Sequence, residues 1–223
     1  TSLDDIVFGG WDPISANALE AARTCGVLEE KDLSPIAQEL EGVVAMDAVF
    51  DQTWVSRLEG TRVKSETNKW DQAMALMADI ENFKVENGCD RLVMVWCGST
   101  EAFQEPSAVH KTVAAFEQGL KDNDDNISPS QIYVYAALQS DVPFANGAPN
   151  LSTDLPCMQE LSHTRGVPIA GKDFKTGQTL MKTLLAPGLK ARMLGLRGWY
   201  STNILGNRDG EVLDAPENFK TKE

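Results

Sequence analysis

The sequence predicts an α/β protein with a doubly wound parallel sheet, because short apolar runs alternate with helical patterns over residues 1 to about 175. Each apolar run has little polar alternation, which suits a strand that is covered on both faces. Each helical pattern spaces its apolar residues three and four positions apart, so that they form one stripe. The predicted strands are residues 6–8, 43–50, 92–96, 132–138 and 167–170, and the predicted helices are residues 19–28, 70–83 and 109–120.

The pattern changes after residue 178. A helix that starts at about residue 178 is predicted to be interrupted at Pro187-Gly188, because proline removes a backbone donor and clashes with the preceding turn. Residues 193–200 then have a β pattern that predicts a different sheet. We therefore predict a domain boundary near residue 178, with residues 1–178 in one domain and residues 179–223 in another.

Composition excludes several classes of partner. The 223 residues are 42% hydrophobic, and 20 basic against 33 acidic side chains give a formal net charge of −13. This charge repels nucleic acid and anionic membranes unless basic residues gather on one face, and the sequence has no such cluster. No apolar run approaches the roughly 20 residues that span a bilayer. Four cysteines without paired spacing predict reduced, buried thiols in a cytoplasmic protein.

Polar residues that follow predicted strands are candidates for ligand contacts. Asp12 follows the first apolar run, where doubly wound folds often place an acid for ribose hydroxyls. It also precedes Pro13, so it could instead begin a helix. Residues 96–100 and 146–150 follow strand-like runs and would lie at the carboxyl edge of a parallel sheet. Ordinary turn chemistry is the alternative for both loops.

Residues 171–179 combine glycines with the start of a helical pattern, which exposes backbone N–H groups suited to phosphate. The stretch is not a P-loop, because Gln178 stands where the phosphate-binding lysine would be. Thr176 could equally be a simple helix cap, with Gly171 and Gly177 only permitting the turn.

A second polar stretch, residues 201–210, offers amides and a carboxylate after an apolar run. Such groups suit a polyhydroxylated, phosphorylated ligand, although a glycine-rich hairpin tip is the alternative. His110 and His163 have no cysteine, acid or histidine at metal-ligand spacing, so we expect them to be structural or exposed. No residue cluster predicts a metal site.

Several motifs occur in a characteristic order along the chain. They are Gly10-Trp11-Asp12, residues 96–101, Asn146-Gly147-x-Pro149, residues 171–179, Asn203-x-Leu205-Gly206-Asn207-x-Asp209-Gly210 and Phe219-x-x-Lys222-Glu223. Together they resemble the myo-inositol phosphate synthase family over essentially the whole chain, which looks like the middle half of a longer member. The N-terminal glycine-rich dinucleotide loop and the part after Glu223, with further catalytic lysines, are not in the sequence.

The resemblance implies a Rossmann-like NAD domain that lacks its first βαβ unit and last strands, followed by the start of an α+β catalytic and oligomerisation domain. Family members convert glucose 6-phosphate to an inositol phosphate with an NAD that is regenerated in each turnover. The implied reaction is hydride removal from C5, enolisation, aldol closure between C6 and C1, and return of the hydride. The implied assembly is a homo-tetramer in the cytoplasm, with a sugar phosphate as substrate and neither nucleic acid nor membrane as a partner.

The resemblance also implies residue roles. The catalytic residues would be Asp173, Lys222, Asn207 and Asp209, because oxyanion intermediates need a nearby cation and proton shuttles. The substrate contacts would be Thr176, Gly177, Gln178, Thr179, Asn203 and Asn207. The cofactor contacts would be Asp12, Gly98, Ser99, Gly147 and Asp173.

Some positions depart from the family pattern. Lys172 stands where the family often has an acid, Ala148 where it has serine, and Arg208 where it frequently has asparagine, which suggests a divergent prokaryotic-type branch. Two alternatives therefore stay open. One is a related NAD-dependent sugar-phosphate oxidoreductase that releases NADH, and the other is a non-catalytic module that binds partners or assembles.

Overall fold

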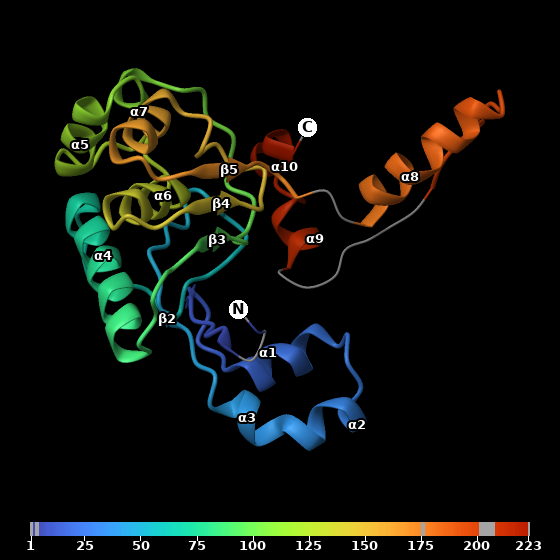
Figure 1. Ribbon diagram of the computed structural model, residues 1–223, viewed down its shortest axis with the longest axis horizontal. Coiled ribbons are helices and arrows are strands. Elements are labelled where there is room, and N and C mark those ends of the chain that lie inside the picture. The colour runs from blue at the N-terminus through green and yellow to red at the C-terminus, as the bar shows by residue number, and fades with distance from the viewer. Residues whose placement is uncertain (1, 3–4, 175–176, 201–207, 223) are drawn as a thin grey trace.

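The parallel strands form two separate sheets in the computed structural model, which describes residues 2, 5–174, 177–200 and 208–222. In the first sheet, β1 (Trp11–Asp12) pairs with β2 (Met46–Asp47). In the second, β3 (Met94–Trp96), β4 (Phe144–Asn146) and β5 (Ile169–Gly171) lie in that order. The α/β class and the parallel pairing are confirmed, while the described residues divide the strands between two sheets (Figure 1).

Helices occupy most of the remaining chain. They are α1 (Ala18–Cys25), α2 (Glu30–Leu33), η2 (Ser34–Ile36), α3 (Ala37–Glu41), α4 (Lys69–Glu86), η3 (Ala108–His110), α5 (Val113–Lys121), α6 (Pro129–Gln139), α7 (Pro156–Arg165), α8 (Gly177–Ala191), α9 (Asp209–Val212) and α10 (Pro216–Lys222). The three helices predicted before residue 121 are confirmed as α1, α4 and α5. None of the helices in the described part of the chain is long and apolar enough to cross a membrane.

The main hydrophobic core lies where α4, α5, α6 and α7 gather beside the three-stranded sheet (Figure 1). Helix α4 begins where the Asn68 side chain accepts a hydrogen bond from the Trp70 N–H, and its stripe buries Ala73, Leu76 and Ile80. Helix α6 packs against α4, α7 and β4 and is buried along nearly its whole length. This core fixes the second sheet firmly.

The predicted strand at residues 132–138 is wrong, because these residues lie inside helix α6. The helix begins at a capping box in which Ser128 and Gln131 bond each other's backbone, with Pro129 in the first turn. Being buried on all sides, the helix has no polar face, so its apolar run looks like a covered strand. The strand that follows, β4, has only three residues and was missed.

Two predictions for the last part of the chain are also wrong. Helix α8 continues through Pro187 and ends at Ala191, and residues 193–200 form no strand. Helix α8 buries none of its described side chains and lies apart from the other helices (Figure 1). In contrast, α9 and α10 return to the body, where Val212 packs in a small apolar cluster with Trp54, Val55 and Leu58.

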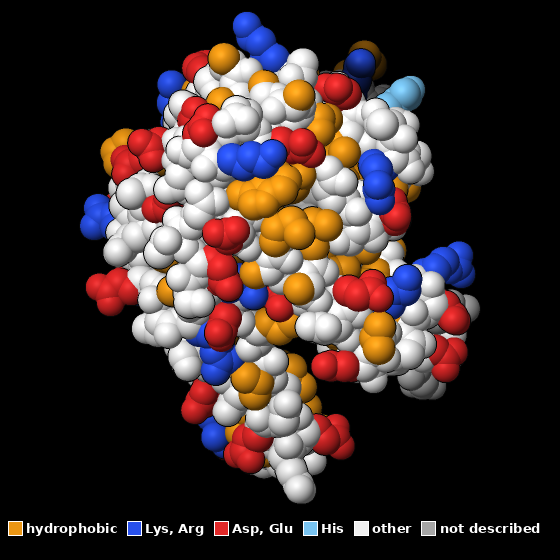
Figure 2. Space-filling view, turned by 90° about the vertical axis from the view of Figure 1, so that its left-hand side faces the viewer, with side chains coloured by type: hydrophobic (Ala, Val, Ile, Leu, Met, Phe, Trp, Pro, Cys, Tyr) orange, Lys and Arg blue, Asp and Glu red, His pale blue; other side chains and the backbone are white. Residues whose placement is uncertain are grey.

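The surface agrees with the charge of the sequence. Figure 2 shows one face of the molecule, on which acidic and basic side chains alternate without a continuous basic patch. This face therefore has no separate positive region, in keeping with the formal net charge of −13.

Candidate functional site

The carboxyl ends of β3, β4 and β5 lie side by side, because the register pairs Trp96 with Asn146 and Asn146 with Gly171. The chain after each strand therefore reaches one common edge. After β5, the Asp173 N–H donates to the Ala148 carbonyl at 3.0 Å and the Phe174 N–H to the Gly147 carbonyl at 3.1 Å. These bonds fasten the loop after β5 to the loop after β4.

Lys222, near the end of α10, lies at the same edge. Its Nζ is 3.4 Å from Oδ1 of Asp173, and both side chains remain partly accessible to solvent. A carboxylate and an ammonium group are thus brought together from positions 49 residues apart. The catalytic roles that the resemblance implies for these two residues stay a prediction. Lys172 instead donates to Asp154 at 2.9 Å.

Two glycines permit the close approach of these loops. A Cβ on Gly147 would lie 2.8 Å from the Trp96 carbonyl oxygen, and one on Gly171 would lie 2.7 Å from the Asn146 carbonyl oxygen. Gly171 also has a φ of +130°, which other residues rarely adopt. The loop backbones at this edge therefore lie so close together that a side chain at either glycine would collide with a neighbouring carbonyl oxygen.

Two buried asparagines hold the loops in shape. The Asn146 side chain donates to the Asn150 carbonyl and to Ser152, and accepts from the Ala148 N–H. The Asn150 side chain donates to the Ser99 carbonyl at 3.1 Å and accepts from the Glu101 N–H, also at 3.1 Å. Asn150 therefore links the loops after β3 and β4, and Asn146 holds the loop after β4. The sequence assigned neither asparagine a role.

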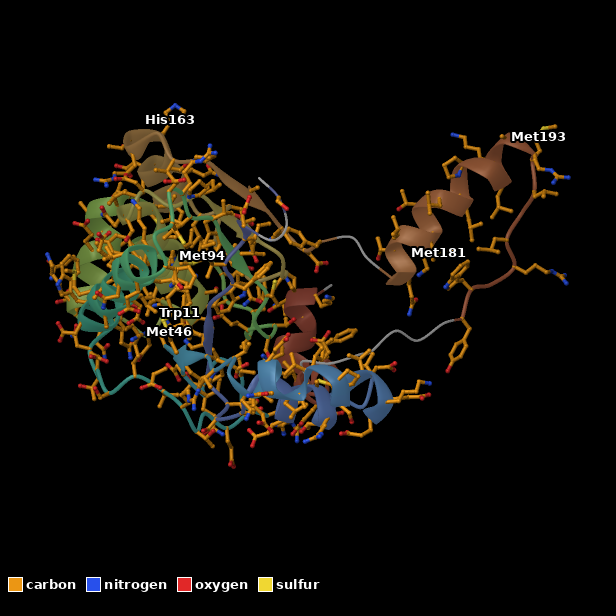
Figure 3. All side chains as sticks on the ribbon, turned by 60° about the horizontal axis from the view of Figure 1, so that its bottom comes forward. Trp11, Met46, Met94, His163, Met181 and Met193 are labelled. Atoms are coloured by element: carbon orange, nitrogen blue, oxygen red, sulfur yellow. The ribbon has the colours of Figure 1, made fainter. Side chains whose placement is uncertain are left out.

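A cavity of about 620 Å³ lies between the two sheets and is lined mainly by apolar side chains. Figure 3 shows Trp11, Met46 and Met94, which belong to three different strands and all line it. Its wall also includes Asp12, Gly98 and Ser99, three of the residues predicted to contact a cofactor. Asp12 from the first sheet and Gly98 and Ser99 from the second therefore share one cavity, whose wall does not include the other two predicted cofactor residues, Gly147 and Asp173.

Aromatic residues connect the two sheets beside this cavity. The Tyr133 ring lies 5.3 Å from that of Trp11 and 5.1 Å from that of Trp96, between centroids. Its hydroxyl accepts a hydrogen bond from the Val49 N–H at 3.0 Å. Trp11 is itself fixed by Asp79, whose carboxylate accepts from the indole N–H at 2.7 Å. A helix residue, Tyr133, thus bridges segments that no strand pairing joins.

Asp12 does not begin a helix. Its carboxylate accepts a hydrogen bond from the Ile14 N–H at 2.7 Å, while α1 starts later and is capped by Asn17 together with Glu20. The helix-start alternative is therefore wrong, and the ligand contact of this exposed side chain on the cavity wall stays a prediction.

The remaining predicted residues fall in the last part of the chain. Thr176, Asn203 and Asn207 lie outside the described residues. Gly177, Gln178 and Thr179 form the first turn of α8, which keeps both the anion-cradle and the simple helix-start interpretations open. Asp209 begins α9, next to Arg208, whose side chain lines the cavity.

His110 is a buried structural residue, and His163 is exposed and points away from the body (Figure 3). The prediction that all four cysteines are buried is wrong, because Cys25 and Cys97 are exposed and only Cys157 is fully buried. Burial raises the pKa of the Cys157 thiol to about 12. Within the described ranges, no group of three or more histidine, cysteine or acidic side chains could hold a metal ion.

Comparison with known proteins agrees with this geometry. A model of NAD-binding domains described as "Myo-inositol-1-phosphate synthase" matches residues 1–216. The chain is 55% identical to inositol-3-phosphate synthase 1 of Bacteroides thetaiotaomicron, covering 100% of this chain and 52% of that protein. It is 34% identical to inositol-3-phosphate synthase of Citrus paradisi, covering 99% of this chain and 44% of that protein.

Among solved structures, inositol-3-phosphate synthase of Caenorhabditis elegans superposes with a TM-score of 0.91 at 26% identity. The match covers 100% of this chain and 44% of that one. The chain therefore spans about half the length of the relatives that it matches.

Proposed function

Because the chain belongs to the myo-inositol-1-phosphate synthase family, we propose that it supplies the NAD site and one side of the sugar-phosphate site of an enzyme that makes inositol phosphate from glucose 6-phosphate. The observation that carries this proposal is the pair formed by Lys222 and Asp173 at the carboxyl edge of the sheet, within 3.4 Å of each other. Ligands of open α/β sheets bind at this edge.

The residues present suit a dinucleotide. The cavity is large and mostly apolar, and the exposed Asp12 carboxylate on its wall could accept hydrogen bonds from ribose hydroxyls. Gly98 and Gly147 lack side chains where the backbone would meet a ligand closely, and a Cβ on either would already collide with Trp96. When bound, NAD supplies a hydride acceptor at C5 of the sugar and later the donor that reduces the ring ketone.

Lys222 and Asp173 would then assist the reactions of the sugar. The Lys222 ammonium would stabilise the negative charge that develops on oxygen during enolisation and aldol closure. Asp173 would hold the ammonium in place through their ion pair, and it could accept or return a proton at the reacting carbons. Gly177, Gln178 and Thr179 would offer backbone and side-chain donors to the phosphate at the start of α8.

The assembly and the compartment form part of the same proposal. We place the start of the catalytic and oligomerisation domain near residue 178, where α8 begins. Helix α8 exposes Leu180, Met181, Leu184 and Leu185, which supports association into a homo-tetramer. The four cysteines, all of which lie in the described part of the chain, form no disulfide bond with one another, which supports the reducing cytoplasm.

The direct test is to incubate the full-length protein with NAD and glucose 6-phosphate and to measure inositol phosphate. We expect product with wild type and a loss of kcat of about 100-fold or more in Lys222→Ala, because an oxyanion stabiliser is removed. Lys220→Ala is the matched control on the same helix, since Lys220 lies over the Phe103 ring 4.5 Å from its centroid and not beside Asp173. It should keep kcat within about threefold of wild type.

Three outcomes would contradict the proposal. If wild type forms no inositol phosphate, the cyclase function is wrong. Accumulation of NADH without cyclised product would identify an oxidoreductase instead. Equal losses in Lys222→Ala and Lys220→Ala would show that helix α10 matters only structurally.

A further inference from the structure

Glu101 is a buried acid that the proposed chemistry does not use. It follows β3 by five residues, and only 4% of it is exposed. Among the residues that the structure describes, no basic side chain forms an ion pair with it. Burial raises the pKa of its carboxyl, and hydrogen bonds from Ser130 and Ser128 partly oppose this shift. Among acids, full burial without a cationic partner is uncommon and calls for a physical reason.

The carboxylate is anchored to the start of helix α6. It accepts hydrogen bonds from the Ser130 N–H at 2.7 Å and from the Ser130 hydroxyl at 2.6 Å. The first turn of a helix leaves backbone N–H groups without internal partners, and α6 is the most deeply buried helix of the core. The side chain of Glu101 is thus attached to the first turn of a helix that is buried along nearly its whole length.

The backbone of Glu101 is attached to two parts of the candidate site. Its N–H donates to the Asn150 side chain at 3.1 Å, and Asn150 in turn donates to the Ser99 carbonyl at 3.1 Å. Its carbonyl accepts from the Thr221 hydroxyl at 2.7 Å, one residue before Lys222. One residue therefore touches the loop that carries Ser99 and the helix that carries Lys222.

Neighbouring hydrogen bonds also join helix α10 to the loop after β3. The Asn218 side chain donates to the Thr100 carbonyl at 2.7 Å and to the Trp54 carbonyl at 2.9 Å. The Phe103 N–H donates to the Glu217 carbonyl at 2.9 Å. Helix α10 has only seven residues and buries only Asn218, so these bonds, rather than apolar packing, hold it beside the loop after β3.

We propose that Glu101 is a positioning residue, which ties the cofactor loop at residues 97–101 and the Lys222-bearing helix α10 to the start of helix α6. Glu101 is also one of the residues that line the cavity, and the role proposed for it is exerted through its bonds to the loop that carries Ser99 and to the helix that carries Lys222. This inference rests on the proposed function for its kinetic consequences, although the tie itself can be measured without any ligand.

The test uses two substitutions of Glu101 in the full-length protein. Glu101→Gln keeps the length and an oxygen acceptor for the Ser130 N–H, and its amide can donate to the Ser130 hydroxyl. It should keep the NAD Kd and kcat within about threefold of wild type. Glu101→Ala removes both bonds, and a misplacement of the loop and of Lys222 should weaken NAD binding and lower kcat by about tenfold or more each.

A third variant separates the two connections. Thr221→Val removes only the hydroxyl that donates to the Glu101 carbonyl, and it keeps the shape of the side chain. It should lower kcat by about threefold to tenfold through Lys222, while the NAD Kd stays unchanged. This variant also keeps the inference testable if Glu101→Ala does not fold.

The matched control is Lys69→Met, which removes another buried charged group, whose own hydrogen bonds go to the segment before α6 and not to residues 97–101 or to α10. Lys69 is 8% exposed, and its Nζ donates to the carbonyls of Asp124 and Ile127 at 2.6 and 2.9 Å. Its loss should lower the Tm while leaving the NAD Kd and kcat within about twofold. A general loss of stability is thereby distinguished from a loss of position.

Hydrogen exchange gives a readout that needs neither NAD nor sugar phosphate. In Glu101→Ala the amides of residues 102–103 and 218–222 should exchange faster than in wild type, and in Lys69→Met they should not. If Glu101→Ala changes only the Tm, as Lys69→Met does, or if Glu101→Gln fails to restore Kd and kcat, the positioning role is wrong. If wild type binds no NAD and forms no product, the proposed function fails, and the exchange data alone decide whether Glu101 ties α10 to α6.

Discussion

The two sheets of this molecule share parallel pairing but differ greatly in how well they are covered. In the second sheet, Phe144 of the central strand β4 and Ile132 of α6 are 1% exposed, and α6 is enclosed by α4 and α7, although Val95 in the edge strand β3 is 48% exposed. Around β1 and β2, Phe8 is 86% exposed and Val43 and Val44 are each 56% exposed. Apolar runs of this kind are usually buried. Several apolar residues of the first region are nevertheless exposed to solvent.

A cavity lies between the two regions. It is lined by Gly9 to Ile14 on one side and by Leu92 to Ser99 on the other. The edges of β1 and β3 that face it pair with no strand in the described part of the chain. Since the relatives are about twice as long, the exposure of the apolar residues 6–8 and 43–44 is consistent with contacts that these 223 residues do not themselves supply, whereas Ala48 and Val49 are buried within them.

The largest expected effect comes from making one substitution in both regions. Phe144→Ala should lower the free energy of unfolding by about 3–5 kcal/mol, because it opens a void in the core. Phe8→Ala should change it by no more than about 0.5 kcal/mol in the isolated 223-residue chain, because the side chain is already in water. Urea denaturation of both variants measures the difference.

The same two variants can contradict the difference in burial between the two regions. If Phe8→Ala destabilises the isolated chain as much as Phe144→Ala, the first region is buried in solution, for example against a second copy of the chain. Repeating the measurement in the full-length protein sharpens the comparison, since a contact made there would raise the cost of Phe8→Ala towards the value for a core phenylalanine.

The contrast between the regions also explains which elements could be predicted. Helix α4 was predicted because one face is apolar and the other polar, so its period is visible in the sequence. Helix α6 was mistaken for a strand because both of its faces are buried, and only the Ser128 and Gln131 capping signal could have corrected the prediction. Strand β4 was missed because three residues are too few to show any period.

Residues of the candidate site could be predicted where they belong to a short motif that is visible in the sequence. The resemblance identified Asp173 and Lys222, and the geometry brings them together. It did not identify Asn146, Asn150 or Glu101, since their role consists of bonds between loops that are distant in sequence. A polar residue at the end of a short apolar stretch, as Asn146 is at the end of β4, is the one available signal.

The next largest effect concerns the bridge between the regions. Tyr133→Phe keeps the ring contacts with Trp11 and Trp96 and removes the acceptor of the Val49 N–H. A buried N–H without a partner should lower the free energy of unfolding by about 1–3 kcal/mol. Urea denaturation measures the loss, and hydrogen exchange should show faster exchange of the Val49 amide.

Tyr135→Phe is the control on the same helix. The Tyr135 hydroxyl donates to Glu117 at 2.9 Å, inside the α5 and α6 pair and away from β2. This variant should leave the Val49 amide as protected as in wild type. Equal protection of that amide in Tyr133→Phe would show that Tyr133 does not connect the two regions in solution.

The smallest effect is a pH dependence confined to the well-covered region. Burial lowers the pKa of His110, partly opposed by its bond to Gln131 and by the charge of Asp124. Its Nδ1 accepts the Ser107 N–H at 2.9 Å, so Nε2 carries the proton and faces the Gln131 oxygen at 3.1 Å. A proton added to Nδ1 would point at an N–H that needs an acceptor.

The direction of the effect follows from proton binding. An unfolded histidine has a pKa of about 6.5, so between that value and the lower pKa in the folded protein the unfolded chain binds more protons. Stability should therefore be complete above about pH 6.5 and decrease as the pH falls through the folded pKa. Hydrogen exchange during acidification should show this loss in residues 107–139, and not in residues 17–41, which contain no histidine.

His110→Asn removes the titrating group, so the stability of this variant should fall less steeply over this pH range than that of wild type. Equal slopes would mean that carboxylates, which are present in both regions, set the acid response and that the regions do not differ in it.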